Sequence, residues 1–584
     1  MGAIALAHGP LDGDAAVRRM LDAARHRGLE IRTERVGESI LGVATTPDAP
    51  SAWVGKKGSS IAAISGALDD ASEIATQLGI EAAGPAQIVL EAFDRWGEGA
   101  LLRLRGAFAV VISDGETVRC FRDRFGTTPL FWGRHGPAFF AATEPKQIVA
   151  GAGIAREPDL DGLERIFFGD VEDETAVRGV RRVPRASIAV SRGGSEPATR
   201  RYWDPRDLVE TGRIDAEEAI GELARILERS VARRLTGADA ILLSGGIDSP
   251  AIAAIASRIA PAGSLRAVSA VYPDHPTVDE RPYIEIVANH VGIPLHTYVP
   301  QAGPLDDVQT WVDLLDGPVD TLSIPLVAEA YRKAREAGAR NVISGEVEED
   351  ALEIRNFLLD HLIGHGRWRA FAREIASRRR NDRTWAAILR ALVRPLLPPR
   401  VASALARNRA DGRMLPPWID HARFAGGTKQ DDLARPRRER WTKLQTAPLF
   451  GQAITFEADE MCAAHCGVGV GRPFADIELW EFALSLPAET KFPEAIPKSL
   501  LRSAMRGVVP DAILDRREKT FFNAYSLSRA DYPALRKWIL ATPHRISGVD
   551  YAHLSDRLER EDLDVIELRW ARDLARIHAF LGLW

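Results

Sequence analysis

The segment ILLSGGIDSP (241–250) has the composition of a phosphate-binding loop. Its apolar run predicts a buried strand that ends in Ser-Gly-Gly (244–246), and Asp248 and Ser249 then open a helix. The two glycines let the backbone turn tightly and direct its N–H groups at a phosphate. The helix N-terminus adds the positive end of its dipole. Ser244 and Ser249 supply hydroxyl donors, and Asp248 can hold Mg²⁺ bound to phosphate oxygens.

The spacing of this loop distinguishes it from other nucleotide-binding loops. It contains no GxxxxGK[ST] pattern, which excludes the Walker type. The pattern SGGxDS is the signature of the ATP pyrophosphatases, which cleave ATP between the α- and β-phosphates. Its place at the end of the first predicted parallel strand also fits, because open α/β sheets bind ligands at the carboxyl ends of their strands.

A second strand end, VISGEVEED (342–350), has the same design. Ser344-Gly345 repeats the small-residue turn, and Glu346, Glu348, Glu349 and Asp350 follow it. One acid can face Mg²⁺ and another can act as a base. Taken alone the segment fits a solvated acidic loop, but we expect it one sheet position away from the phosphate loop, which favours the functional interpretation.

The elements that must position these residues change in character along the chain. Glycines and turn residues separate short apolar runs in the first two hundred residues, which is typical of packed antiparallel sheets; examples are 60–68, 106–113, 116–123 and 137–144. From residue 239, strands alternate with helices, which predicts a parallel sheet covered on both faces. The predicted strands follow at 266–272, 294–299 and 340–345, and the predicted helices at 250–260, 281–292 and 324–338. Beyond residue 350 the chain is mostly helical and rich in arginine.

Composition excludes several classes of protein. The chain has 584 residues, 46% of them hydrophobic and 27% charged, as in an ordinary globular protein of several domains. A net charge of -5 argues against a general nucleic-acid binder. Three cysteines provide no disulfide framework and favour a reducing compartment. We see no signal peptide or membrane span, so we expect a cytoplasmic protein without a membrane partner.

Over nearly its whole length the chain resembles the asparagine synthetase B superfamily. The N-terminal similarity lies in LRGAFAVVISD (104–114), FRDRFGTTPLFW (121–132) and FAATEPKQIVA (140–150). The C-terminal similarity lies in SGGIDS, DERPYIEIV (279–287), DGP (316–318), SGE (344–346), RPFADIELWEFALSLP (472–487) and KSLLRSAMRGVVPDAILDRREKTFF (498–522). The resemblance implies a two-domain α/β fold. Residues 1–205 would form an Ntn-hydrolase-like αββα sandwich of the glutamine amidotransferase type. Residues 206–584 would form an ATP-pyrophosphatase domain, a doubly wound parallel sheet with a large helical portion.

The resemblance also assigns roles to the site, with ATP and Mg²⁺ as cofactors. Lys519 matches the lysine that neutralises charge on the reacting phosphate and on the tetrahedral intermediate. Glu346 matches a candidate base for the attacking amine, and a metal-binding acid falls on Glu349 or, with a shift of one residue, on Asp350, beside Asp248. The phosphates would be bound by Ser244, Gly245, Gly246, Asp248 and Ser249, and the adenosine by Leu243, Val271, Ser344 and Gly345. For Lys498 we favour a surface lysine at the start of a helix over a role at the site.

The N-terminal domain departs from the family at its reaction centre. Amidotransferases of this type need Cys directly after the initiator Met, and this chain has Gly2. HRG (26–28) persists, but Leu29-Glu30 replaces the Pro-Asp that normally follows it. The Gly-x-x-Tyr-Asn pattern of the glutamine site is here Gly-Ala-Leu-Asp-Asp (66–70). We therefore expect that glutamine is not hydrolysed and that an amine other than glutamine-derived ammonia is the nucleophile.

Two branches of the family fit such a domain: the β-lactam synthetases and the lasso-peptide cyclases. The β-lactam type places Tyr after the Ser/Thr-Gly turn, where this chain has Glu346, and region 356–420 is similar to the arginine-rich helical insert of the lasso cyclases. We further hypothesise that a basic helical wall around the arginines of 377–380, with Trp368 and Trp385, holds a folded peptide. A solvated amphipathic face is the alternative for that region.

The leading interpretation is a macrolactam synthetase that adenylates an Asp or Glu side chain of a precursor (core) peptide and closes it on the N-terminal amine. A leader peptidase would be its partner, because the amine must first be freed. A β-lactam or other small-molecule amide synthetase, an asparagine synthetase using free ammonia, and an inactive scaffold remain the alternatives. Cys462, His465 and Cys466 suggest zinc by type, but core packing on a helix is the expected role.

Overall fold

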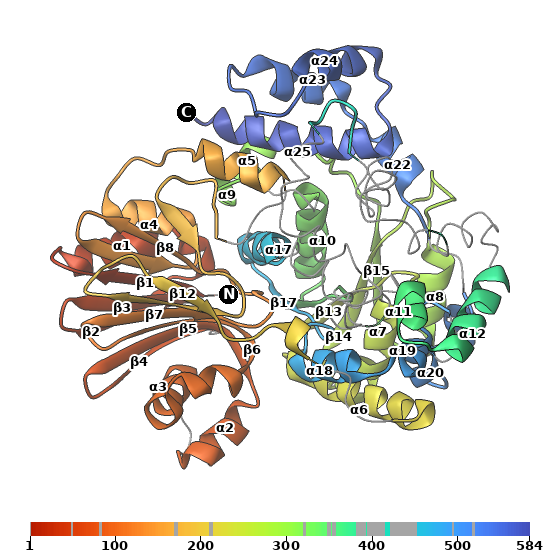
Figure 1. Ribbon diagram of the computed structural model, residues 1–584, viewed down its shortest axis with the longest axis horizontal. Helices are drawn as coiled ribbons and strands as arrows, with labels where there is room; N and C mark the ends of the chain where they lie inside the picture. The colour runs from red at the N-terminus through yellow and green to blue at the C-terminus, as the bar shows by residue number, and fades with distance from the viewer. Residues whose placement is uncertain are drawn as a thin grey trace.

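The fold is described from a computed structural model (Figure 1). It describes residues 2–47, 51–80, 84–168, 173–208, 214–318, 323–346, 352, 358–380, 393, 415–420, 453–492, 496–516 and 520–584, without the side chains of residues 360, 377–380, 453, 454 and 541. The predicted residues Glu348, Glu349, Asp350, Trp385 and Lys519 lie outside this part of the chain, as do the side chains of 377–380.

The N-terminal part of the chain forms a sandwich of two six-stranded antiparallel sheets with strands between residues 3 and 201, which confirms the predicted αββα architecture (Figure 1). We refer to this part and the longer remainder as the two halves of the chain. One sheet has the order β10 (Val180–Arg182), β8 (Phe131–His135), β9 (Ala138–Ala142), β1 (Ala3–His8), β3 (Ser39–Thr45) and β2 (Glu30–Val36). The other has the order β12 (Ala198–Arg201), β11 (Ser187–Arg192), β7 (Thr117–Arg122), β6 (Arg105–Ser113), β5 (Ser60–Asp69) and β4 (Ala52–Lys57). We call these two sheets and their covering helices the N-terminal sandwich.

Strand β5 shows why the sheets are apolar on both faces. Ile61 and Ala63 lie in the core between the two sheets, whereas Ala62 and Ile64 lie under the helices of the outer layer. Successive side chains of a strand point to opposite faces, so a strand in a middle layer must be apolar at every position. The outer layers are α1 (Gly13–Asp22) and α4 (Pro145–Ala152) on one side, and α2 (Ala71–Leu78) and α3 (Pro85–Trp96) on the other (Figure 1).

The second half of the chain is built on a five-stranded sheet in which every neighbouring pair is parallel, as predicted. Its order is β15 (Leu295–Tyr298), β14 (Leu265–Ala270), β13 (Asp239–Leu242), β16 (Asn341–Ile343) and β17 (Gly469–Gly471). The edge strand β17 was not predicted from the sequence. It is a Gly-Val-Gly segment far along the chain, with neither the length nor the apolar character of a strand signal.

Helices cover both faces of this parallel sheet, and each layer has its own core. One layer contains α6 (Ala216–Arg234), α7 (Asp248–Ile259), α8 (Arg281–Val291), α18 (Ile477–Ser485) and α20 (Ser499–Ala504). The other contains α9 (Val308–Leu314), α10 (Ile324–Glu336) and α17 (Ala453–Cys466). Helix α17 lies between the N-terminal sandwich and α10 (Figure 1).

The C-terminal helices pack over the boundary between the two halves. Helix α25 (Val565–Leu581) lies against α9 and against α5 (Leu160–Phe168) of the sandwich, and α23 (Tyr532–Ala541) and α24 (Tyr551–Arg560) complete this layer. Short helices fill the remaining described segments: α11 (Leu358–Gly364), α12 (Trp368–Arg380), α19 (Ala488–Lys491), α21 (Asp511–Leu514) and α22 (Asn523–Ser528). Residues from both halves therefore share one hydrophobic cluster.

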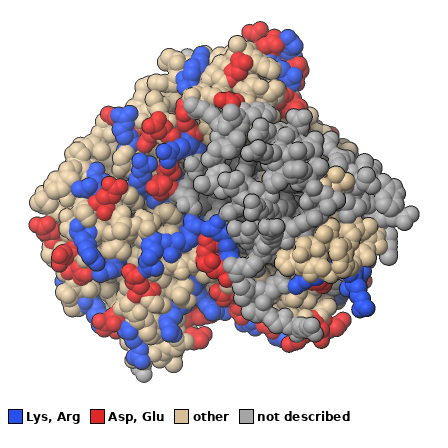
Figure 2. Space-filling model, in the orientation of Figure 1, with Lys and Arg blue, Asp and Glu red and all other residues tan. Residues whose placement is uncertain are grey.

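Charges of both signs are mixed on the face of the sandwich that Figure 2 shows. In the described residues, no helix combines the length and the apolar character needed to cross a membrane. The expected packing role is confirmed for Cys462, whose thiol is fully buried beside α10. It is wrong for His465, which is exposed on the same helix, and Cys466 is only partly buried. The described residues hold no group of three or more His, Cys, Asp or Glu side chains placed to bind a metal.

A buried histidine makes the stability of the C-terminal layer depend on pH. His578 of α25 is fully buried, and its ring contacts Thr542 Oγ1 at 2.6 Å and Tyr551 Oη at 3.0 Å. Burial, followed by the charge of Arg545, lowers the pKa of His578 from 6.5 to about 4. Between these two values the unfolded chain binds a proton that the folded chain does not, so stability falls as the pH falls from 6.5 to about 4.

We predict that His578→Gln flattens this dependence. At 1.36 kcal/mol per pKa unit, the wild type loses up to about 3 kcal/mol across the window, and the variant avoids this loss. Calorimetric unfolding at pH 7.5 and at pH 5 measures it. The drop in melting temperature should shrink in His578→Gln but not in His135→Gln, a control at an exposed histidine; equal drops in all three proteins would refute the prediction.

Candidate functional site

The predicted phosphate loop lies at the carboxyl end of β13, the central strand of the parallel sheet. Ser249, in the first turn of α7, fixes the loop: its Oγ accepts a hydrogen bond from the Ser244 N–H at 2.9 Å and lies 3.0 Å from Ser244 Oγ. The Gly246 N–H approaches Ser244 Oγ at 3.4 Å. The sequence thus builds a closed turn directly before the helix N-terminus, as a phosphate cradle requires.

The second predicted turn, Ser344-Gly345-Glu346, lies directly beside this loop. Strand β16 pairs with β13, which confirms the expected neighbouring position. A Cβ on Gly345 would lie 3.1 Å from the Ser249 nitrogen and 3.2 Å from Asp248 Cβ. A glycine at this position lets the backbone of one strand end approach the helix that follows the other.

The residues predicted to line the adenosine site lie on adjoining strand ends. Leu243 and Val271 are buried and follow β13 and β14, and Ser344 is buried at the end of β16. The Leu243 N–H donates to Val268 at 3.0 Å, and the Val271 N–H donates to Tyr298 at 2.9 Å. The sheet ladder therefore continues up to the predicted binding edge.

Glu280 and Arg516 were not predicted from the sequence, and both contact the phosphate loop. The Gly245 N–H donates to Glu280 Oε2 at 3.0 Å, where a phosphate oxygen would be expected to lie. Arg516 donates to the Gly245 carbonyl at 2.6 Å and to Glu280 Oε1 at 2.9 Å. Thr520 donates to the same Glu280 oxygen at 2.7 Å. The Glu280 carboxylate, held by Arg516 and Thr520, therefore accepts the hydrogen bond from a loop N–H that could otherwise bind a phosphate oxygen.

Lys498 corrects the expectation of a surface lysine. It lies at the N-cap of α20 with a φ of 56°, is only 9% exposed, and its Nζ lies 2.6 Å from Asp248 Oδ2. Two residues 250 positions apart thus form an ion pair at the phosphate loop. The carboxylate of Asp248 is a hard oxygen ligand of the kind Mg²⁺ prefers, and Lys498 brings a cation to the place where the triphosphate would be bound.

Glu346 joins a polar network that extends to α17 and α10. Its N–H donates to Ser344 Oγ at 3.3 Å, and its Oε2 lies 3.4 Å from Arg472 Nε. Arg472 also binds Asp459 of α17, which accepts a hydrogen bond from Tyr331. Desolvation and the nearby charge of Asp459 raise the pKa of Glu346, and Arg472 opposes them. The side chain is still 43% exposed, so water moderates the effect.

In the N-terminal sandwich, the space for the missing nucleophile is filled. A Cβ on Gly2 would lie 2.9 Å from the Ala44 carbonyl and 2.9 Å from the Ala52 nitrogen, and closer still to the Ala52 methyl group. Gly2 is buried, and its own carbonyl accepts a hydrogen bond from Ser65 Oγ at 2.8 Å. The backbone of β3 and β4 leaves no room for a side chain at the position where an amidotransferase has its cysteine.

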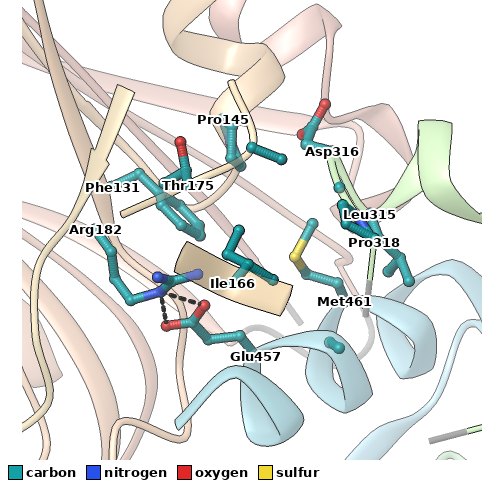
Figure 3. A pocket seen from close by; sticks show the side chains of 13 residues that line it. Phe131, Pro145, Ile166, Thr175, Arg182, Leu315, Asp316, Pro318, Glu457 and Met461 are labelled. Carbon is teal, nitrogen blue, oxygen red and sulfur yellow. Dashed lines mark hydrogen bonds and ion pairs between the residues drawn. The ribbon is translucent and has the colours of Figure 1, made fainter. Parts of the chain in front are cut away.

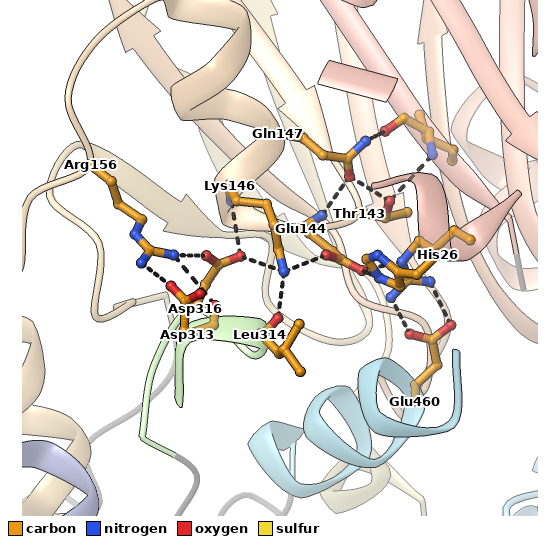
Figure 4. A network of polar contacts seen from close by, with 12 residues as sticks. His26, Thr143, Glu144, Lys146, Gln147, Arg156, Asp313, Leu314, Asp316 and Glu460 are labelled. Carbon is orange, nitrogen blue, oxygen red and sulfur yellow. Dashed lines mark hydrogen bonds and ion pairs between the residues drawn. The ribbon is translucent and has the colours of Figure 1, made fainter. Parts of the chain in front are cut away.

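The remnants of the glutamine pattern bind the other half of the chain. Asp69 forms an ion pair with Arg234 of α6 at 2.7 Å, and Asp70 forms one with Arg233 at 3.1 Å. Arg27, from the HRG segment, is fully buried between Glu144 of the sandwich and Glu460 of α17. Figure 4 shows these two acids, with Glu460 on α17. These side chains hold the two halves of the chain together.

A small cavity of about 40 Å³ lies at the same boundary (Figure 3). Phe131, Ile166 and Arg182 line it from the sandwich, and Glu457 and Met461 line it from α17. Arg182 and Glu457 form an ion pair in its wall at 2.7 Å (Figure 3). The volume corresponds to a few water molecules at most, far below that of a pocket for an amino acid.

Comparisons with known proteins agree with this division of the chain. A family model described as asparagine synthase matches residues 222–581, and one described as a glutamine amidotransferase domain matches residues 1–203. Among curated proteins, a provisionally named glutamine-hydrolyzing asparagine synthetase of Mycobacterium tuberculosis H37Rv is 28% identical over 496 residues, which is 78% of this chain and 72% of that protein.

Two further relatives differ in how much of the chain they match. Asparagine synthetase 3 of Bacillus subtilis, named as glutamine-hydrolyzing, is 22% identical over 83% of this chain and 77% of its own length. The carboxyethyl-arginine β-lactam synthase of Streptomyces clavuligerus is 31% identical over 192 residues, 32% of this chain and 34% of that protein.

We predict that restoring the cysteine does not restore glutamine hydrolysis. Gly2→Cys forces a side chain against the backbone of two strands, and overpacking of this kind costs about 1–3 kcal/mol. Glutamate release from glutamine should stay at background, and the melting temperature should fall. Gly84→Cys is the control, because no atom of the described residues lies within 4 Å of a Cβ there. Glutaminase activity in Gly2→Cys would contradict the prediction.

We also predict that Lys498→Met weakens nucleotide binding at least tenfold, about 1.4 kcal/mol, because it removes a buried cation beside the phosphate loop. Calorimetric titration with Mg²⁺ and an ATP analogue that cannot be cleaved between the α- and β-phosphates measures this. Lys537→Met, which removes an ammonium group from the face of Trp538, is the control and should bind normally. An unchanged Kd in Lys498→Met would exclude this role.

Proposed function

The chain belongs to the asparagine synthase family of ATP-dependent amide ligases, and we propose that it closes a macrolactam ring in a lasso precursor peptide. The carboxylate of an Asp or Glu side chain of the core peptide attacks the α-phosphorus of ATP and releases pyrophosphate. The N-terminal amine of the same peptide then attacks the acyl-adenylate and releases AMP. An internal amide forms, and one ATP is consumed.

The observation that carries the proposal is the contrast between the two predicted reaction centres. The phosphate loop is intact, with Ser244, Asp248 and Ser249 placed at a helix N-terminus beside the turn of Glu346. The glutaminase position is closed by backbone at Gly2. An enzyme that activates a carboxylate but has no room for the ammonia-generating cysteine needs another amine, and the N-terminus of the substrate supplies one.

Glu346 is the candidate acceptor for the proton of the attacking amine. A carboxylate with a raised pKa is a better base near neutral pH than an ordinary one. Its Oε2 lies 3.4 Å from Arg472 Nε, and the turn that carries it adjoins the phosphate loop. The acid after the Ser-Gly turn is also the sequence feature that separates this chain from the β-lactam type, which has Tyr there.

Magnesium would be held by Asp248 and by Glu349 or Asp350, and it would neutralise charge on the phosphate oxygens. We propose that Lys519 stabilises the reacting phosphate and the tetrahedral intermediate. The partners proposed are the core peptide and a leader peptidase that frees its amine. Trp368 is 62% exposed on α12, where the hypothesis of a peptide-holding wall requires an accessible aromatic side chain.

A second candidate is a small-molecule amide synthetase of the β-lactam type. The similarity to the Streptomyces clavuligerus β-lactam synthase favours it, since the identity reaches 31% there. The substrate would then carry both its carboxylate and its amine within one amino-acid derivative. Synthesis of asparagine from aspartate and free ammonia is the remaining alternative.

The test is an incubation of the purified protein with ATP, Mg²⁺ and the leader-free core peptide encoded in a neighbouring short reading frame. We predict AMP and a peptide that is lighter by one water and resists carboxypeptidase. Glu346→Gln should lower the rate of ring closure by about 10²-fold or more. AMP formed only with small amino-acid derivatives would overturn the peptide assignment, and asparagine formed from aspartate and ammonia would establish the remaining alternative.

A further inference from the structure

Acidic side chains of α17 contact both halves of the chain. Glu457 and Glu460 contact the N-terminal sandwich. Asp459 contacts Arg472, which follows β17 of the parallel sheet, and α10. All three are almost completely buried, at 3%, 4% and 1% exposure. Since buried charges persist only when they are paired, each acid must be matched by a cation.

The cations for Glu457 come from two strands of the sandwich. Arg122 ends β7 and donates to Glu457 Oε1 at 2.5 Å, and Arg182 ends β10 and donates to both carboxylate oxygens at 2.7 and 2.8 Å. Arg122 is itself fixed, because its Nε donates to the Thr128 carbonyl at 2.8 Å. The acid is therefore held from two directions.

The cation for Glu460 is Arg27, which donates to both carboxylate oxygens at 2.7 and 2.9 Å. Arg27 also binds Glu144, which pairs with Lys146 at 3.0 Å and with His26 at 2.8 Å. Burial disfavours the charged form of Arg27, but the two carboxylates more than compensate and raise its pKa. The guanidinium thus stays charged and locks one turn of α17 to the sandwich.

On the other side of the same turn of α17, Asp459 is connected through Arg472 to Glu346, the candidate base. Asp459 accepts hydrogen bonds from Arg472, just after β17, and from Tyr331 of α10. Arg472 reaches Glu346, whose turn adjoins the phosphate loop. A shift of α17 relative to the parallel sheet would displace Asp459 and, through Arg472, the carboxylate of Glu346.

We propose that Arg27, Arg122 and Arg182 are positioning residues for amide formation: the sandwich fixes α17 and, through Asp459 and Arg472, the carboxylate of Glu346. The inference rests on the proposed function in taking Glu346 as the base. It gives the amidotransferase-like half a role in the synthetase reaction without glutamine hydrolysis. Misplacement of a reacting group by about 1 Å can cost about 10²-fold in rate.

The test is the double variant Glu457→Gln/Glu460→Gln, which keeps side-chain size and removes both charges from the sandwich side of α17. The kcat for ring closure of the core peptide should fall at least tenfold, while the KM for ATP changes less than twofold. Asp313→Asn is the matched control. It weakens the ion pair with Arg156, another contact between the halves, without touching α17, and should keep kcat within twofold.

Hydrogen exchange measured by mass spectrometry provides a readout that needs no substrate. In the double variant, amide exchange over residues 456–474 should be at least tenfold faster than in the wild type, and Asp313→Asn should leave it unchanged. An unchanged kcat or unchanged exchange in the double variant overturns the inference. If the wild type does not close the peptide, the proposed function fails, and exchange over 456–474 alone decides whether the sandwich fixes α17.

Discussion

The burial of charge at the boundary between the N-terminal sandwich and the parallel sheet is the constraint on which the structure depends. Arg27, Arg122, Glu144, Glu457 and Glu460 have almost no contact with solvent, and an unpaired charge in such surroundings is very costly. In the observed arrangement of the halves, each of these charges has a partner of opposite sign. The hydrophobic cluster shared by α5, α9 and α25 buries further apolar surface at this boundary. Apolar contacts are not directional, so they define the relative position of the two halves less strictly than the ion pairs do.

The same constraint explains how an amidotransferase-like fold can persist without its nucleophile. In the segments that resemble the glutamine site of amidotransferases, Asp69 and Asp70 pair with arginines of α6, and Arg27 pairs with α17. The backbone of neighbouring strands fills the space above Gly2. Charged residues in these segments pair with the other half of the chain, as the proposed role of the sandwich as a support requires.

The sequence predicts the fold well where one local pattern determines one element. The alternation of strands and helices after residue 239 leads to the parallel sheet, and the apolar runs before residue 150 lead to the sandwich strands. The neighbouring positions of the SGGIDS and SGE turns are also confirmed. Strand β17 was missed because its pairing with β16 depends on tertiary contacts, and the sequence of a short glycine-containing segment gives no signal of them.

Long-range contacts at the site could not be predicted from spacing. The expectation that Lys498 is a surface residue is wrong because its partner, Asp248, lies 250 residues earlier in the chain. Glu280 and Arg516 meet only at the folded phosphate loop. One signal for α17 was present: Glu457, Asp459 and Glu460 interrupt a helix that is otherwise largely apolar, AITFEADEMCAAHC, and buried acids imply buried cations. The roles assigned to Glu349, Asp350 and Lys519 remain predictions.

The most direct measurement of the central claim is the fate of carboxylate oxygen. A core peptide labelled with ¹⁸O in its acceptor Asp or Glu side chain is incubated with ATP, Mg²⁺ and the enzyme. The ¹⁸O content of the AMP is then measured by mass spectrometry. If the carboxylate attacks the α-phosphorus and the amine then displaces AMP, one ¹⁸O per turnover appears in AMP. AMP free of label, or label found in pyrophosphate or inorganic phosphate, would contradict the account.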